Sequence, residues 1–339
     1  MHRPALAFAV ALAATVAAAV AATFAAQAPA RGAGTELSLV AYSTPREAYG
    51  QLIALFQKTP AGNGVSFTQS YGSSGDQTRA VKAGLKADIV ALSLAPDMDE
   101  LVKAGIVDSK WNRQSYKGMV TDSVVVFMVR DGNPKRIKTW NDLLRPGIDV
   151  VTPNPFTSGG ARWNVMAAYG AWRKSGQTDA QAQANLLKLF RNVVAQDKSA
   201  RDSLNTFLSG KGDVLLGYEN EAILANLKGQ KVPYVIPRST ILIENPIAVT
   251  KSSANRDTAN NFLRFLRTPS AQQVFANWGY RPVVKSVLEK NRKKFPVRPG
   301  QFTIDQLGLG GWDKVQKRFF DPKSGIMARI ENTVGGVTG

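Results

Sequence analysis

The sequence predicts an α/β protein with mostly parallel sheets, helices on both sides and two lobes. Three observations lead to this fold class. Strand-like and helix-like segments alternate along the chain, which is typical of parallel sheets. The chain has 339 residues, more than one hydrophobic core comfortably holds. Two loops rich in serine and glycine follow predicted strands, at the end where open α/β sheets bind ligands. We therefore expect the two loops to face each other across a cleft.

The periodicity of apolar residues places the individual elements. In the helix predicted at 46–57, Tyr49, Leu52, Ile53 and Phe56 share one apolar face. Strands are predicted at 37–42, 65–70, 87–92, 124–129, 149–152, 213–218, 234–236, 241–243 and 246–249. Further helices are predicted at 77–85, 97–104, 140–144, from Ser158 through Lys174, and at 180–194, 199–208, 221–227, 258–266 and 270–278.

The N-terminal segment has the pattern of an export signal. The chain begins Met-His-Arg, is apolar and rich in alanine from Ala5 to Ala26, and then reaches a small-x-small sequence ending at Ala28. We interpret residues 1–28 as a secretory signal and residues 29–35 as a flexible lead. A retained membrane anchor is the alternative, because about 20 apolar residues suffice to span a bilayer.

Two missing residue types exclude several kinds of chemistry. The chain has no cysteine, and its only histidine is His2, which leaves with the signal. This excludes zinc sites of Cys/His type, Ser-His-Asp and Cys-His catalysis, and imidazole acid–base chemistry. We therefore expect no metal, no cofactor and no enzyme activity. Ser-Lys catalysis and hydrolysis by paired carboxylates are the options left open.

The chain is strongly basic, with a formal net charge of +18 that becomes 18 − 1 = +17 once Arg3 is removed. Such a charge suits nucleic acid, an acidic membrane surface or small anions. Nucleic-acid binding predicts clustered basic residues or basic residues interleaved with aromatics. Here the Lys and Arg residues are scattered, and the one local cluster, at 290–294, is interpreted as a solvated loop. We expect no nucleic-acid partner.

The two serine-glycine loops have the chemistry of anion-binding helix N-termini. Ser158 can cap the helix that follows it, and Gly159 and Gly160 let a ligand approach bare backbone N–H groups. The loop at 71–77 has the same character and contains Ser74. Together they predict two halves of one site. Plain helix capping without a ligand is the alternative for both serines.

Four segments carry a resemblance to a known family. They are 152–155 with 157–164, 212–216 with 219–222, 279–283, and 302–305 with 310–312. In order and spacing they resemble the sulfate/thiosulfate-binding periplasmic proteins that feed ABC importers. The resemblance implies the two-lobed type II periplasmic binding protein fold with a ligand cleft between the lobes. It also implies a periplasmic location, sulfate or thiosulfate as ligand and a membrane ABC permease as partner; we expect a monomer.

In that fold the chain crosses between the lobes twice. We place the crossings near Val129 and Thr240, which assigns 36–128 and 241–339 to lobe I and 129–240 to lobe II.

The resemblance also implies a set of ligand-binding residues. They are Ser43, Ser74, Ser158, Gly159, Gly160, Ala200 and Tyr218. Two of them depart from the family pattern, because Ser43 stands where an aspartate is usual and Tyr218 where a tryptophan is usual. Both keep a donor group. The departures leave open the choice among tetrahedral anions, and Tyr218 has the alternative role of a packing aromatic.

A site of this kind selects by hydrogen-bond pattern. A fully ionised dianion only accepts, so it suits a pocket of donors, whereas hydrogen phosphate brings a proton that such a pocket cannot accept. Asp76 would relax this selection if its carboxylate turned inward; the alternative is that it faces solvent and complements the helix dipole. Molybdate or phosphate therefore remain alternative ligands. A secreted enzyme acting on sulfated or phosphorylated compounds is the alternative from another class.

Overall fold

The computed structural model describes residues 34–336. The predicted signal at 1–28 and all of the predicted lead except its last two residues lie outside this range. Within the described range, no helix is both long and apolar enough to cross a membrane.

The described chain alternates strands and helices as predicted. The strands are β1 Glu36–Tyr42, β2 Ser66–Gly72, β3 Ile89–Ala91, β4 Met119–Val129, β5 Val150–Pro153, β6 Val193–Asp197, β7 Val214–Tyr218, β8 Tyr234–Val235, β9 Ser239–Val249, β10 Arg281–Pro282 and β11 Gly300–Phe302. The α-helices are α1 Arg46–Phe56, α2 Ser74–Lys82, α3 Ala95–Lys103, α4 Gly159–Lys174, α5 Asp179–Arg191, α6 Ala200–Leu208, α7 Glu219–Leu227, α8 Arg256–Leu266, α9 Pro269–Asn277, α10 Lys285–Lys290, α11 Gly311–Phe320 and α12 Ile326–Val334. The predicted helix at 140–144 is the 3₁₀ helix η3, Trp140–Leu144.

The strands form a mixed sheet whose two ends are parallel. Its main path runs β2-β1-β3-β9-β4-β7-β5-β6. We call β2-β1-β3 the first half-sheet and β7-β5-β6 the second half-sheet; neighbouring strands within each are parallel. Every antiparallel pair among the described strands includes β4 or β9. The predicted mixed α/β sheet is confirmed.

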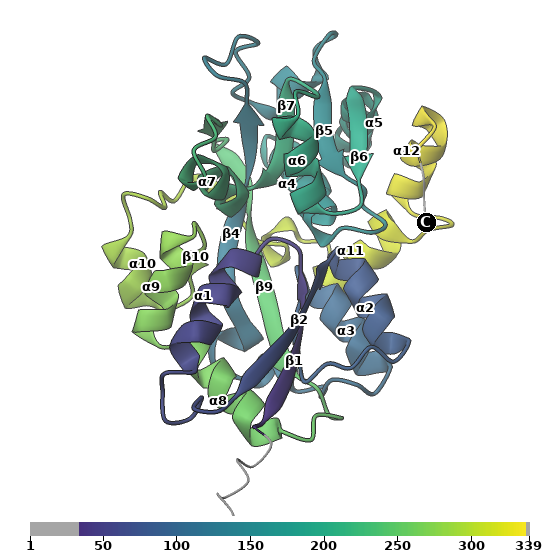
Figure 1. The fold of residues 1–339 in the computed structure, drawn as a ribbon. Coiled ribbons are helices and arrows are strands. Elements are labelled where there is room, and N and C mark those ends of the chain that lie inside the picture. The colour runs from purple at the N-terminus through teal and green to yellow at the C-terminus, as the bar shows by residue number, and fades with distance from the viewer. Residues whose placement is uncertain (1–33, 337–339) are drawn as a thin grey trace, which may run out of the picture. The chain divides into compact units, whose positions relative to one another are not determined.

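Strands β4 and β9 join the two half-sheets. β4 pairs with β9 between Met119 and Val124, and from Val125 to Val129 it pairs with β7 instead. The two strands run side by side through the middle of Figure 1. The sequence predicted only 124–129, because polar side chains interrupt the first part of β4. The lobe boundaries near Val129 and Thr240 stay a prediction.

Helix α1 follows its sequence pattern closely. The predicted apolar face of Tyr49, Leu52, Ile53 and Phe56 is buried. The Tyr49 ring meets Phe275 of α9 edge to face, with centroids 5.8 Å apart. This apolar face therefore anchors the helix that begins just after Ser43.

Two predicted helices had boundaries that were wrong by three residues, α2 and α5. Helix α2 begins at Ser74 and not at Gln77, because Ser73 caps it: the Ser73 hydroxyl accepts from the N–H of Asp76 at 3.3 Å. Helix α5 ends at Arg191, and the residues from Val193 form β6, which pairs in parallel with β5. The apolar periodicity of α5 ran on into this β-branched strand, so the sequence pattern did not reveal the change.

The C-terminal helices α11 and α12 were not predicted. The Trp312 ring lies 4.8 Å from that of Trp163 in α4, and Phe319 lies 4.8 Å from Tyr169 of the same helix. Figure 1 shows this segment beside the helices that follow β5. The C-terminal segment therefore packs on the helix that follows the Ser158 loop.

Candidate functional site

The start of helix α4 brings several predicted site residues together. Gly160 lies so close to its neighbours that a methyl group on its Cα would come within 2.8 Å of Tyr218 Cε2 and 3.2 Å of Ala200 Cβ. The same methyl would lie 3.4 Å from the hydroxyl oxygen of Ser158. Ser158, Gly160, Ala200 and Tyr218 thus meet at one point, at the carboxyl ends of β5, β6 and β7.

Gly159 makes an equally close approach to the first half-sheet. A methyl on its Cα would lie 2.3 Å from Leu94 Cδ2 and 2.4 Å from the hydroxyl oxygen of Ser93. Only glycine fits at this distance. The loop that follows β3 is therefore in direct contact with the first residue of α4, the helix that follows β5.

Ser74 joins the same cluster from helix α2. Its Oγ accepts a hydrogen bond of 3.0 Å from the N–H of Ser93. One residue on, the N–H of Gly75 donates to the carbonyl of Thr157 at 3.0 Å. The two serine-glycine loops thus face each other.

Ser43 lies in the loop between β1 and α1 and is partly exposed. Its neighbours on both sides reach the cluster: the Tyr42 ring centroid is 6.2 Å from that of Tyr218, and the Thr44 carbonyl accepts from Arg201 Nη2 at 2.9 Å. Arg201 follows Ala200 directly. Of the seven predicted residues, Ser43 is placed by its neighbours and not by a contact of its own.

Helix N-termini converge on this cluster, since α2, α4, α6 and α7 all begin there. The first N–H groups of a helix have no intrahelical partner and carry a partial positive charge. Ser73 and Ser199 use their hydroxyls to cap α2 and α6, whereas Ser158 makes no capping bond with its side chain and Ser74 is not the cap of its helix. Plain capping therefore does not account for Ser74 and Ser158.

Ser93 belongs to the cluster, although the sequence analysis did not single it out. Its hydroxyl lies 2.6 Å from the Tyr218 hydroxyl, and its carbonyl accepts from Trp163 Nε1 at 3.0 Å and from Asn245 Nδ2 at 2.8 Å. Burial raises the pKa of Tyr218 well above its usual value, so the phenol keeps its proton. Ser93 could have been found by its position, since it is a small polar residue at the carboxyl end of the strand predicted at 87–92.

Asp76 points away from the cluster. Its carboxylate accepts from the Ser73 hydroxyl at 2.5 Å and pairs with Arg79, and its side chain is 45% exposed. The inward orientation that would accept a ligand proton is not observed. Asp76 instead occupies the first turn of α2, where a carboxylate complements the helix dipole.

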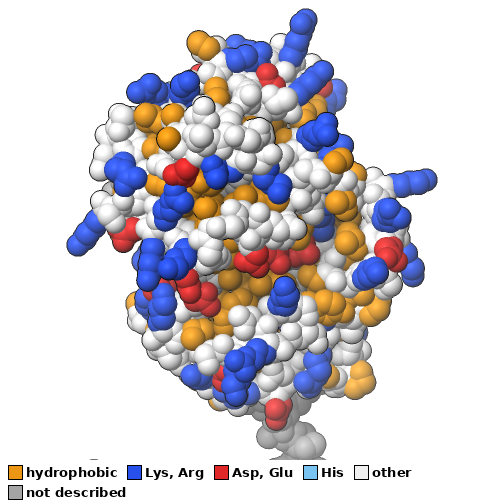
Figure 2. Space-filling model, turned by 180° about the vertical axis from the view of Figure 1, so that it is seen from behind, with side chains coloured by type: hydrophobic (Ala, Val, Ile, Leu, Met, Phe, Trp, Pro, Cys, Tyr) orange, Lys and Arg blue, Asp and Glu red, His pale blue; other side chains and the backbone are white. Residues whose placement is uncertain are grey.

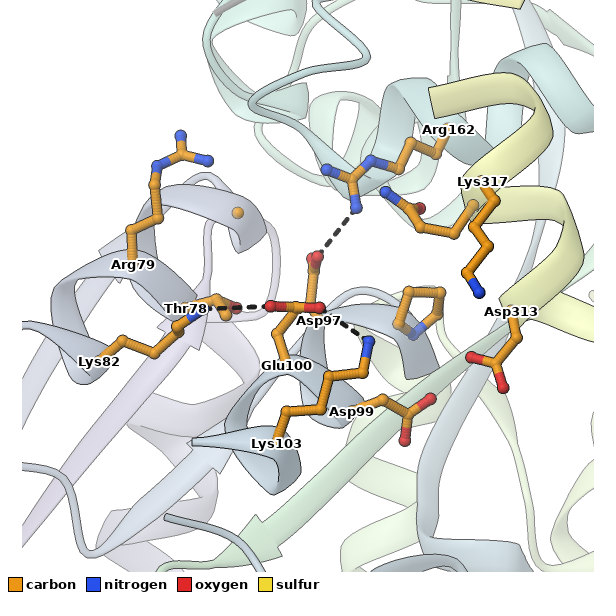
Figure 3. Close-up of a pocket in the computed structure, with 13 residues that line it drawn as sticks. Thr78, Arg79, Lys82, Asp97, Asp99, Glu100, Lys103, Arg162, Asp313 and Lys317 are labelled. Atoms are coloured by element: carbon orange, nitrogen blue, oxygen red, sulfur yellow. Dashed lines mark hydrogen bonds and ion pairs between the residues drawn. The ribbon is translucent and has the colours of Figure 1, made fainter. Parts of the chain in front are cut away.

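The arginine of helix α4 is already paired. Arg162 Nη1 donates to Asp97 at 2.9 Å, and its Nε donates to the Pro155 carbonyl at 3.0 Å. Figure 3 shows this pair spanning from α4 to α3, at the edge of a pocket between α2, α3, α4 and α11. The pocket is lined by basic side chains and also by carboxylates, which include Asp99, Glu100 and Asp313. It is therefore unsuited to a dianion.

A second arginine is paired beside Ala200. Arg201 donates to Glu221 at 2.7 Å and to Glu47 of α1 at 2.9 Å. Burial alone would raise the pKa of Glu47, but hydrogen bonds from Arg201 and Lys228 outweigh it and lower the pKa to about 2. These ion pairs connect α6 and α7, which follow β6 and β7, with α1, which follows β1.

Two further observations concern the back face and the metal-ligating residue types of the described residues. Figure 2 shows Lys and Arg side chains spread over the back face, with acidic side chains near its middle, so this face carries no continuous basic stripe. Within residues 34–336, no three or more His, Cys, Asp or Glu side chains are grouped so that they could hold a metal ion.

Comparison with known proteins decides the family. Residues 37–281 match the family model described as bacterial extracellular solute-binding protein, a stretch that contains both serine-glycine loops. The chain belongs to this family. The solute-binding protein is 42% identical to the sulfate-binding protein of Synechococcus elongatus over 321 residues, 91% of each chain. It is 34% identical to the thiosulfate-binding protein of Pseudomonas aeruginosa over 303 residues, 86% of this chain and 91% of that protein.

A solved structure extends the comparison to the fold. The solute-binding protein is similar to the sulfate-binding protein SubI from Mycobacterium tuberculosis, with a TM-score of 0.82 and 42% identity. The match covers 85% of this chain and 100% of that one. The resemblance and the type II fold expected from the sequence are thereby confirmed.

Proposed function

We propose that this solute-binding protein captures sulfate, and also thiosulfate, between its two half-sheets and delivers it to an ABC permease in the membrane. It acts in the periplasm, as a monomer and without catalysis. The observation that carries the proposal is the convergence of neutral donors at the start of α4, beside arginines that are bonded to carboxylates. The names of the relatives support the choice of anion.

The ligand-binding residues we propose share one property, which is that each can offer a hydrogen to the anion. They are Ser43, Ser74, Ser158, Gly159, Gly160, Ala200 and Tyr218. For Gly159, Gly160 and Ala200 the donor is the backbone N–H in the first turn of a helix. Hydroxyls supply the donors of Ser74, Ser158 and Tyr218, and Ser43 offers a hydroxyl or its N–H.

Neutral donors of this kind suffice to hold a dianion. Each helix end supplies roughly half a positive charge, and a hydrogen bond to a charged group contributes about 1.5–3 kcal/mol. About six such bonds offset the dehydration of the anion and the ordering of the loops. We expect a dissociation constant in the micromolar range or below, which corresponds to about 8 kcal/mol or more.

The test is calorimetric titration of the chain without residues 1–28, using sulfate, thiosulfate, molybdate and phosphate. We expect sulfate and thiosulfate to bind in the micromolar range or tighter. Ser158→Trp should abolish binding, because the new side chain fills the point where the donors meet. The fold should stay intact, although the burial of Ser158 makes overpacking cost about 1–3 kcal/mol of stability. Ser209→Trp, at the exposed end of α6, is the matched control. Unchanged affinity in Ser158→Trp, or no binding of any of the four anions by the wild type, would refute the proposal.

A further inference from the structure

We propose that Ser93 and Tyr218 act as a hydroxyl pair that forms one hydrogen bond with the anion, either as donor or as acceptor. The pair thereby determines how tightly the site binds protonated anions. The inference rests on the proposed function and adds Ser93 to its site. The two oxygens lie 2.6 Å apart, and each residue is 1% exposed. Ser93 follows β3 of the first half-sheet, and Tyr218 ends β7 of the second.

The pair lies at the donors that the proposed site uses. A methyl on Gly159 would come within 2.4 Å of Ser93 Oγ, and a methyl on Gly160 within 2.8 Å of the Tyr218 ring. The N–H of Ser93 donates to Ser74 Oγ at 3.0 Å. Because that oxygen accepts from Ser93, the Ser74 hydroxyl keeps its own hydrogen to donate elsewhere.

Counting hydrogens shows what the pair offers. Two hydroxyls carry two hydrogens, and the bond between them uses one. Either oxygen can be the donor in that bond. The other hydrogen therefore belongs to Tyr218 when Ser93 donates, and to Ser93 when Tyr218 donates. The N–H and carbonyl of Ser93 are both engaged, so its hydroxyl is the adjustable group.

A hydroxyl pair differs from an N–H donor in one respect that affects specificity. A backbone or indole N–H can only donate, whereas a hydroxyl also accepts. Facing sulfate, the pair turns its remaining hydrogen toward the anion. Facing hydrogen phosphate, it turns a lone pair toward the proton of the ligand. The pair thus removes part of the penalty that a site of donors alone imposes on a protonated anion.

The experiment measures the dissociation constants of sulfate and phosphate for the wild type, Ser93→Ala, Tyr218→Phe and the double variant. Each single variant keeps one hydroxyl, so we expect its sulfate affinity to fall less than about fivefold. The double variant has none, and its sulfate affinity should fall about 10- to 100-fold, the equivalent of one charged hydrogen bond. Its phosphate affinity should fall about tenfold further, because no acceptor is left for the proton.

Two control variants and one substitute variant keep the test specific. Ser93→Thr keeps a hydroxyl and should keep the ratio of phosphate to sulfate affinity within about twofold of the wild type. Tyr169→Phe removes a phenol that donates to Asp179 at 2.6 Å, away from the site, and should leave both affinities unchanged. If the double variant does not fold, Ser93→Cys with Tyr218→Phe makes the same comparison, because a thiol is only a weak donor and acceptor.

The outcomes separate this inference from the proposed function. A double variant that loses sulfate and phosphate affinity by the same factor, or that loses neither, overturns the role of the pair and leaves the proposed function standing. A wild type that binds no sulfate overturns the proposed function itself.

Discussion

The proposed site and its surroundings handle charge in opposite ways. In the site, the groups that meet are hydroxyls and the N–H groups of glycines, all of them neutral. Around it, Arg162, Arg201 and Arg281 are each bonded to carboxylates. The comparison teaches that the net charge of +18 is not what would hold the ligand. These arginines already have anionic partners, so dipoles would meet the charge of a bound anion.

The largest effect we expect tests the charged surroundings. Arg281 and Glu219 form a buried pair at 2.7 Å, with side chains 3% and 0% exposed. Arg281→Met leaves the Glu219 charge buried without its partner and should lower the free energy of unfolding by about 3–5 kcal/mol at pH 7, measured by urea denaturation. Burial raises the pKa of Glu219, so the loss should shrink at acid pH as this carboxyl becomes neutral.

Lys285→Met is the matched control for that change. Lys285 faces Glu289 at 3.9 Å with its side chain 89% exposed, so its removal should cost less than about 0.5 kcal/mol. Equal losses for the two variants would contradict the contrast between buried and exposed pairs.

The second prediction tests the neutral groups of the proposed site. Gly159→Ala places a methyl 2.3 Å from Leu94 Cδ2, so the loop after β3 and the start of α4 cannot approach each other as closely as they do here. Sulfate affinity measured by calorimetry should fall at least about 100-fold, or about 2.7 kcal/mol. Gly50→Ala serves as control, since Gly50 lies in α1 with open space around it and should not affect binding. Wild-type affinity in Gly159→Ala would show that the ligand does not need this contact.

A third prediction concerns the carboxylate that Arg201 and Lys228 hold. Glu47 has its pKa lowered to about 2, so its charge stabilises the folded state above the unfolded pKa of about 4.3, and this contribution is lost as the pH falls toward 2. Glu47→Gln should therefore lower the free energy of unfolding by about 2 kcal/mol at pH 7, a value that allows for partial exposure. The difference from the wild type should disappear near pH 2. A loss that stays constant with pH would point to packing and not to charge.

The smallest effect concerns a carboxylate without an arginine of its own. Asp122 of β4 stands opposite Glu244 of β9, and the adjacent Arg281 is engaged by Glu219. Burial and then the Glu244 charge raise the pKa of Asp122 to about 8, although Arg281 opposes this.

A raised pKa means that Asp122 contributes stability below its unfolded pKa of about 3.9 and that this is lost as the pH rises through 8. Asp122→Asn should equal the wild type in stability near pH 4 and exceed it by up to about 1 kcal/mol at pH 9, since the side chain is only partly buried. Urea denaturation at the two pH values gives the comparison. A variant less stable than the wild type at pH 9 would contradict it.

The sequence predicted most of the residues that meet at the start of α4, because their signal is local. A serine-glycine segment ahead of a helix predicts an anion-binding N-terminus from a few neighbouring residues. Ser74, Ser158, Gly159 and Gly160 lie close together in the structure, as one shared site requires. Ser93 was missed because its position after a predicted strand is a weak signal by itself, and its partner Tyr218 lies far away in the sequence. The ligand contacts themselves stay a prediction.

The same distinction applies to the fold. Helix α1 was predicted from its own periodicity, because four apolar residues at helical spacing form its buried face. Strand β6 and helix α11 depend on partners far away in the sequence, β5 for the first and α4 for the second. For β6 the local pattern was misleading, because it continues the apolar periodicity of α5.

Strands β4 and β9 decide how this molecule can move. β9 pairs with β3 of the first half-sheet, β4 pairs with β7 of the second, and β4 and β9 pair with each other. Separating the half-sheets would therefore mean twisting this two-stranded ribbon and not unfolding a loop. A paired ribbon can twist while it keeps its backbone hydrogen bonds, and these fix its register. Each cycle of capture and release would therefore bring the serines and glycines back to the same mutual positions.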